Sequence, residues 1–155
     1  MDWFITTPTM ILSTITFMDY IRRKEAQPVD RKTQEVTNLW TFLRDNWKST
    51  TLILVSNVIM LLMGFLHEMG IVDIWTSTMV GFVAFGSVFY EMRTSFANSH
   101  AINEYLWTYM VSTWGMYGVA ALFPNIIKNT AYNLLDIVSK NFYSVFLTTY
   151  ILNLT

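Results

Sequence analysis

Apolar residues gather in five stretches, each about as long as a membrane crossing and separated from the next by polar residues. The stretches are residues 1–20, 49–66, 71–90, 105–123 and 126–152. A transmembrane helix needs roughly 20 residues to cross about 30 Å of hydrocarbon. The pattern therefore predicts an all-α protein in which five membrane-spanning helices form a single domain over residues 1–155.

Polar residues inside the first and last stretches recur at helical spacing. The first stripe is Asp2, Thr6, Thr9, Ser13 and Thr16, and the second is Asn129, Asn133, Asp136, Lys140, Ser144 and Thr148. Hydrocarbon offers no hydrogen-bond partners, so both stripes should face the bundle interior or water, and we expect the two faces to meet. The alternative for a single hydroxyl is a hydrogen bond to a carbonyl of its own helix.

Lys140 and Asp136 are the only charged residues between Asn129 and Thr155. A charge at the bilayer centre costs at least about 2.5–3.5 kcal/mol, so such residues are usually functional. A spacing of four residues places the two side chains on one helix face, where each lowers the cost of the other. A structural ion pair inside a transporter bundle is the alternative interpretation.

The middle stretches add aromatic faces around such a lysine. At helical spacing lie Trp107, Met110, Trp114 and Tyr117 in the fourth, Trp75, Thr78, Phe82, Phe85 and Phe89 in the third, and Asn57, Met60 and Gly64 in the second. An aromatic stripe alone indicates packing. A lysine amine in a dry aromatic pocket beside a carboxylate, however, is suited to forming a Schiff base with an aldehyde.

Composition and charge support a membrane protein with a defined orientation. The chain is 53% hydrophobic and 14% charged, which excludes an ordinary soluble domain, and it has no cysteine for a disulfide or thiolate site. Seven of the ten basic residues lie in the first connection (Arg22, Arg23, Lys24, Arg31, Lys32, Arg44 and Lys48), and Arg93 lies in the third. The positive-inside rule then places these connections and the C-terminus in the cytoplasm.

Three short motifs give the chain a family resemblance. Residues 2–8, Asp-Trp-Phe-Ile-Thr-Thr-Pro, resemble the signature of the third helix of microbial rhodopsins. Trp114-Gly-Met-Tyr117 is similar to the motif of their sixth helix, and Leu135-Asp-Ile-Val-Ser-Lys140 to that of their seventh. The residues of the first and last motifs are most similar to those of rhodopsins of giant algal viruses and of proteorhodopsins. The chain thus resembles helices three to seven of a seven-helix fold.

The resemblance implies a cofactor and roles for named residues. Lys140 would hold all-trans retinal as a protonated Schiff base, with Asp2 as the primary counterion and proton acceptor and Asp136 as the second counterion. The residues expected to enclose the cofactor are Trp3, Thr6, Thr7, Met10, Met60, Gly64, Trp75, Thr78, Trp114 and Tyr117. No metal site is expected, since His67 and His100 lie near membrane boundaries.

The resemblance leaves three functions open, none of them enzymatic. Light-driven proton transport is the first, because Asp2 and Lys140 suffice for light-driven proton transfer. A light-gated cation channel is the close alternative, since Ser13 stands where pumps usually carry a carboxylic proton donor. A photosensory receptor is the third. The expected partners are the lipid bilayer and protons or cations, with no nucleic acid; a homo-oligomer remains open.

Other departures concern the beginning of the chain and the first connection. The arginine one turn before the counterion is missing, and Gly118 replaces a common proline. We therefore expect two further apolar spans and such an arginine upstream of Met1.

In the first connection, an amphipathic pattern is formed by Val36, Leu39, Trp40, Leu43 and Trp47. This pattern suits either a helix in the headgroup region or an extension of the next span. Glu68 and Asp73 are interpreted as solvated loop charges.

Overall fold

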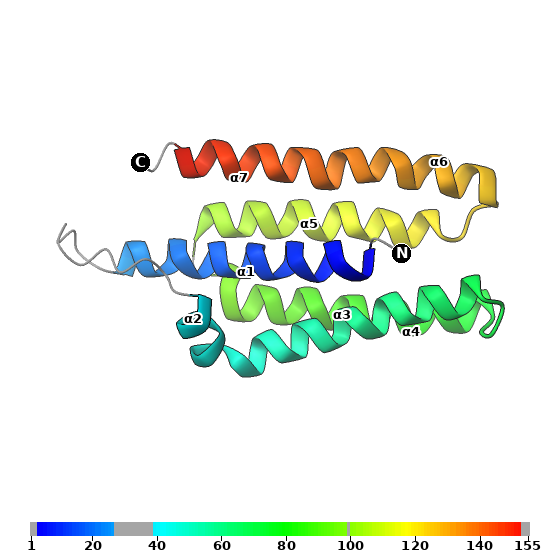
Figure 1. Ribbon diagram of the computed structural model, residues 1–155, viewed down its shortest axis with the longest axis horizontal. Coiled ribbons are helices and arrows are strands. Elements are labelled where there is room, and N and C mark those ends of the chain that lie inside the picture. The colour runs from blue at the N-terminus through cyan, green and yellow to red at the C-terminus, as the bar shows by residue number, and fades with distance from the viewer. Residues whose placement is uncertain (1–2, 27–38, 99, 153–155) are drawn as a thin grey trace. The chain divides into compact units, whose positions relative to one another are not determined.

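The computed structural model describes residues 3–26, 39–98 and 100–152, and every element in these ranges is helical (Figure 1). In chain order the elements are α1 Trp3–Ala26, α2 Leu39–Asp45, α3 Trp47–Glu68, α4 Ile74–Met92, the π-helix η1 Arg93–Ala97, α5 Ala101–Ala120, α6 Asn125–Asp136, the π-helix η2 Ile137–Phe142 and α7 Tyr143–Leu152. The chain divides into two compact units, residues 1–107 and 108–155, which are described separately.

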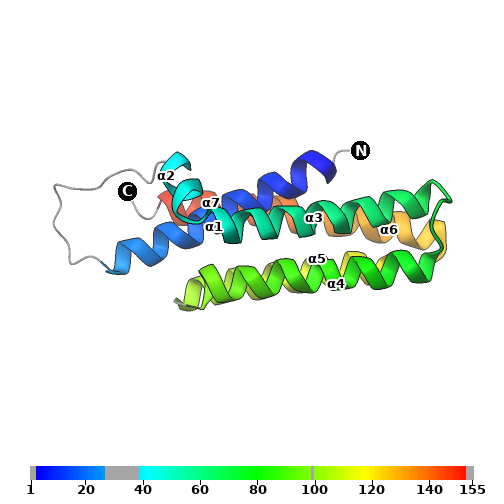
Figure 2. The same cartoon turned by 90° about the horizontal axis from the view of Figure 1, so that it is seen from below.

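In the first unit, α3 and α4 form a closely packed antiparallel hairpin (Figures 1 and 2). The hydroxyls of Ser56 and Ser87 lie 3.2 Å apart across it, and Ser77 donates to the Met63 carbonyl at 2.7 Å. Small hydroxyl side chains allow two helices to approach closely and to share hydrogen bonds where lipid supplies none. The hairpin is thereby held by polar contacts as well as by packing.

The turn between α3 and α4 follows from two residues. Gly70 adopts a φ of +71°, a left-handed conformation that glycine adopts without steric cost. Asp73 then caps α4, because its Oδ1 accepts the backbone N–H groups of Trp75 and Thr76, both at 3.0 Å. A hydrogen bond from the Thr76 side chain, followed by the one from its backbone N–H, holds the pKa of Asp73 below its usual value. Asp73 is therefore a helix cap and more than a solvated loop charge.

Helix α1 supplies the core of the first unit and packs on α3 and η1. Ile11, Ile15 and Met18 are completely buried along one face. Asn103, which is equally buried, donates through Nδ2 to the Met18 carbonyl at 3.0 Å and to the Phe96 carbonyl at 3.2 Å. One amide thus joins the beginning of α5 to α1 and η1.

In the second unit, the C-terminal part of α5 and the last helix run antiparallel, joined by a short turn before α6 (Figure 1). The backbone remains helical through Asp136, Ile137 and Tyr143. Therefore α6, η2 and α7 form one continuous helix whose middle turn is a π-helix. The Asp136–Lys140 pair lies at this irregular turn.

A helix lies at each of the five predicted spans, but the stretches differ in apolar character. Among the described helices, α3 is the one that is long and apolar enough to cross a membrane by length and composition alone. A polar stripe lowers the hydropathy of α1, and η2 divides the last helix into shorter elements. The five crossings themselves remain a prediction.

The amphipathic segment of the first connection forms a short separate helix, α2, in its described part. Asn46, with a φ of −113° and ψ of 23°, separates α2 from α3. Phe42 is fully buried, whereas Trp40 and Trp47 are exposed. Exposed tryptophans beside a short amphipathic helix are typical of the membrane interface, where their rings contact the headgroup layer. The N-terminal part of the pattern, including Val36, lies outside the described residues.

Candidate functional site

Lys140 and Asp136 form an ion pair in the second unit. Lys140 Nζ lies 2.8 Å from Asp136 Oδ2, and each side chain is about one-third exposed. The pair arises from the i, i+4 spacing, which brings the two side chains together across one turn. Its geometry is that of a charge-assisted hydrogen bond.

The Asp136 carboxylate is held from a second side by α5. Tyr117 donates its hydroxyl to Asp136 Oδ1 at 2.5 Å, and the same hydroxyl lies 3.0 Å from Ser139 Oγ. Ser139 is almost fully buried. The two carboxylate oxygens therefore have different partners, the Tyr117 hydroxyl and the Lys140 amine. This arrangement fixes the orientation of the carboxylate relative to the amine.

Helix α5 has further buried residues near Tyr117 in the sequence, and Tyr117 has an aromatic neighbour on α6. Trp114 is 8% exposed and Thr113 is 6% exposed on α5. The ring of Tyr132 lies 5.6 Å, centroid to centroid, from the ring of Tyr117. The contact with Tyr132 restricts the Tyr117 side chain, which in turn restricts the Asp136 carboxylate.

Two members of the cluster were absent from the sequence-based prediction. Ser139 is part of the Leu135–Lys140 motif, but nothing in the pattern pointed to its hydroxyl. Tyr109 donates its hydroxyl to the Val138 carbonyl at 2.5 Å. Tyr109 lies eight residues before Tyr117, so helical periodicity places both on one face of α5, and this spacing was a signal that could have found it.

The other predicted site residues described by the structure lie in the first unit. Trp3, Thr6, Thr7 and Met10 are on α1, Met60 and Gly64 on α3, and Trp75 and Thr78 on α4. Trp75 is 70% exposed, and a Cβ added to Gly64 would meet no atom within 4 Å. Asp2, the predicted primary counterion, lies outside the described residues. The meeting of these residues with Lys140 stays a prediction.

The hydroxyls of the α1 stripe show the local hydrogen bonding that was the alternative interpretation. Thr9 donates to the Ile5 carbonyl at 2.7 Å, Ser13 to Met10 at 2.9 Å and Thr16 to Leu12 at 2.8 Å. These bonds satisfy each hydroxyl proton within α1. The oxygens can still accept a hydrogen bond, so the stripe can receive a proton donor from another group.

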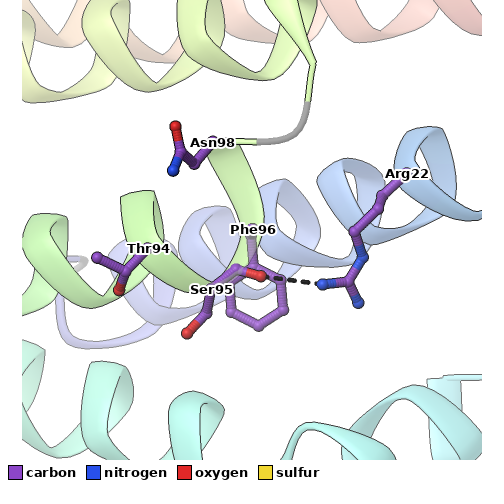
Figure 3. Close-up of a pocket in the computed structure, with 5 residues that line it drawn as sticks. All are labelled: Arg22, Thr94, Ser95, Phe96 and Asn98. Carbon is purple, nitrogen blue, oxygen red and sulfur yellow. Dashed lines mark hydrogen bonds between the residues drawn. The ribbon is translucent and has the colours of Figure 1, made fainter.

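A second charged cluster lies at the C-terminal end of α1. The buried carboxylate of Asp19 pairs with Arg22 and with Arg23, the latter at 2.7 Å, and Arg23 reaches Asp45 at 3.4 Å. The hydrogen bond to Asp19 raises the pKa of Arg23. Arg22 also donates to the Ser95 carbonyl at 3.1 Å, as Figure 3 shows. The cluster ties α1 to α2 and η1.

The cavity of about 230 Å³ shown in Figure 3 lies at this second cluster and is lined by Arg22, Thr94, Ser95, Phe96 and Asn98. It contains none of the residues predicted to enclose the cofactor. Its volume is also below the roughly 300–1,000 Å³ of typical ligand pockets. We therefore assign the candidate site to the Lys140 cluster.

Comparisons with known proteins bear on the family and the fold of the chain. A family model described as "Bacteriorhodopsin-like protein" matches residues 1–154. The structure is similar to the crystal structure of viral rhodopsin OLPVRII, with a TM-score of 0.80 and 27% sequence identity over 99% of this chain. The chain spans 65% of the length of that viral rhodopsin. No match is found among curated proteins.

Proposed function

Because the chain belongs to the bacteriorhodopsin-like family, we propose that it binds retinal on Lys140 and uses light to transport ions, protons in the first place. The observation that supports this most strongly is the contact between Lys140 and Asp136 at 2.8 Å, with Asp136 held by Tyr117. The membrane location follows from the family and from the helical fold. The choice of protons as the transported ion belongs to the proposal.

The residues of the cluster fit a retinal group. A lysine side chain carries a primary amine, which condenses with an aldehyde to form a Schiff base, and Lys140 supplies this amine in the cluster. Asp136 supplies a negative charge close enough to stabilise a positive nitrogen at that place. Trp114 and Tyr117 supply aromatic surface on α5. When bound, retinal supplies the light-driven isomerisation that changes the position of the nitrogen and its proton.

Each residue of the proposed site then has a defined role. Lys140 holds the cofactor, and Asp136 stabilises the positive charge in the dark. Tyr117 orients Asp136 and keeps one of its oxygens occupied, which leaves the other for the amine. Asp2 is proposed to accept the proton after light absorption. Ser13 has no ionisable group near neutral pH, so the returning proton is proposed to come from the cytoplasmic solution.

A light-gated cation channel is the second candidate. The observation that favours it is the hydroxyl character of the α1 stripe, in which Thr9, Ser13 and Thr16 follow one another without a carboxylic acid. A hydroxyl-lined face can hydrate a cation path without supplying a proton donor. The same residues therefore suit a passive path as well as a pump with slow proton return.

Photocurrents at zero voltage separate the two candidates. The full-length protein is measured in a membrane with identical solutions on both sides. A pump generates current under these conditions, because light supplies the driving force. A channel has no driving force there, so a current that appears only with a gradient or an applied voltage would favour the channel.

A further inference from the structure

The structure shows a main-chain contact next to Lys140 that the proposed function does not use. The Tyr109 hydroxyl on α5 donates to the Val138 carbonyl of η2 at 2.5 Å. Val138 lies midway between Asp136 and Lys140 in the sequence. A change in the backbone at Val138 therefore changes the relation between the ion-pair residues on either side.

The π-helical turn explains why this backbone needs support. In a π-helix each N–H bonds to the carbonyl five residues earlier, so the turn is wider and less favourable than an α-helical turn. η2 extends from Ile137 to Phe142 and includes Lys140. A hydroxyl from a neighbouring helix gives one of its carbonyls a strong partner in surroundings where lipid offers none.

Helix α5 contacts the η2 region through two tyrosines on one face. Tyr117 bonds to the side chains of Asp136 and Ser139, and Tyr109 bonds to the main chain at Val138. The first contact fixes the carboxylate, and the second fixes the backbone from which Lys140 extends. With only one of them, either partner of the ion pair could shift relative to the other.

We infer that Tyr109 is a positioning residue for Lys140: its hydrogen bond to the Val138 carbonyl holds the π-helical turn in the form that aligns the Lys140 nitrogen with Asp136. This inference rests on the proposed function, because alignment matters when the nitrogen carries retinal. The contact itself is independent of retinal. The two can therefore be tested separately.

The contact is tested first without the cofactor. The Val138 carbonyl is labelled with carbon-13 in the full-length protein, and its infrared band is compared with that of Tyr109→Phe. Loss of a hydrogen bond moves a carbonyl band to higher wavenumber, so we expect an upward shift in Tyr109→Phe. Tyr105→Phe is the matched control, because Tyr105 is on the same helix and 76% exposed. An unchanged Val138 band in Tyr109→Phe would overturn the inference whether or not the protein binds retinal.

The effect on Lys140 is tested in the retinal-loaded protein by alkaline titration of the visible band. Tyr109→Phe should lower the midpoint by about one pH unit, a tenfold easier loss of the proton, while Tyr105→Phe leaves it unchanged. A midpoint that equals that of the unmutated protein would refute the positioning role. Absence of a visible band in the unmutated protein would instead refute the proposed function and leave the infrared result to decide the contact.

A fluorinated tyrosine guards against a variant that fails to fold. 3-Fluorotyrosine at position 109 keeps the ring and the hydroxyl but makes the hydroxyl a stronger donor. The titration midpoint should then move upward, opposite to Tyr109→Phe. A purely steric role of Tyr109 gives no reversal of sign, so a downward or absent shift with this residue would contradict the inference.

Discussion

Tyr117 donates its hydroxyl to Asp136 Oδ1 at 2.5 Å, while Lys140 bonds to the other oxygen of the same carboxylate at 2.8 Å. The carboxylate is thus oriented by Tyr117 on α5 and forms an ion pair with Lys140 on η2. Sequence spacing accounts for the Lys140 contact, since four residues make one helical turn. The Tyr117 contact needs the packing of two helices.

Replacing Tyr117 with phenylalanine should weaken retinal binding while the protein still inserts. A hydrogen bond to a charged group contributes about 1.5–3 kcal/mol, so we expect retinal affinity to fall by roughly 10- to 100-fold. The measurement is a retinal titration followed by the visible band, with Tyr105→Phe as the control on the same helix. Equal affinity in Tyr117→Phe would show that Asp136 is oriented without this hydroxyl.

Asp2 is tested as the counterion by Asp2→Asn. Removal of a negative charge near the protonated nitrogen should shift the visible band to longer wavelength and lower the pH at which the band is lost in alkaline solution. Absorption spectra between neutral and alkaline pH provide the measurement. The unmutated protein is also measured in acid, where protonation of Asp2 should shift the band in the same direction. If Asp2→Asn has the spectrum of the unmutated protein, and acidification shifts no band, Asp2 is not the counterion.

Ser13 determines how the protein regains its proton. Ser13 follows Asp2 by eleven residues in the sequence, which corresponds to about 16 Å in a helix. If no internal acid acts there, the deprotonated intermediate should decay more slowly as pH rises. Ser13→Asp should supply a local donor and flatten this dependence.

Flash photolysis from mildly acidic to mildly alkaline pH measures the decay in both proteins. Ser13→Asn is the matched control, because it adds a polar group of similar size that cannot donate a proton in this range. A decay of the unmutated protein that is already independent of pH would show that another internal donor exists.

Asp73 should make the stability of the α3–α4 hairpin dependent on pH. Its folded-state pKa is lowered, chiefly by Thr76, so the carboxylate form stabilises the fold. The contribution is complete above the usual value of 3.8 and is lost as pH falls through the lower folded value. Thermal unfolding at neutral pH and near pH 3 should show a smaller difference in Asp73→Asn than in the unmutated protein. Glu68→Gln, in the same connection, is the control, and an equal effect of both substitutions would argue against the cap.

The helices and the central ion pair were predictable from the sequence because they depend on local spacing. Apolar periodicity located the helices, and the i, i+4 rule located Asp136 beside Lys140. The family assignment, made from three short motifs, is confirmed by the match over residues 1–154. These features need no knowledge of how distant parts of the chain pack.

Other features were not predictable because they depend on packing between helices or on irregular backbone. A hydrophobic period of 3.6 residues does not reveal a π-helical turn, so η2 was missed, and with it the contact from Tyr109. The burial of Asp19 beside two arginines was missed for a related reason: Asp19 lies at the end of a predicted span, where a carboxylate is ordinarily an interfacial charge. The local hydrogen bonds of Thr9, Ser13 and Thr16, in contrast, agree with the alternative interpretation for individual hydroxyls.

The most direct test of the account is Lys140→Ala in membranes supplied with all-trans retinal. Alanine costs less in lipid than lysine, so insertion and helix content should be unchanged. The account predicts that the visible absorption band present in the unmutated protein is absent in this variant. A band of the same wavelength and intensity in Lys140→Ala would contradict the assignment of Lys140 as the retinal-binding residue.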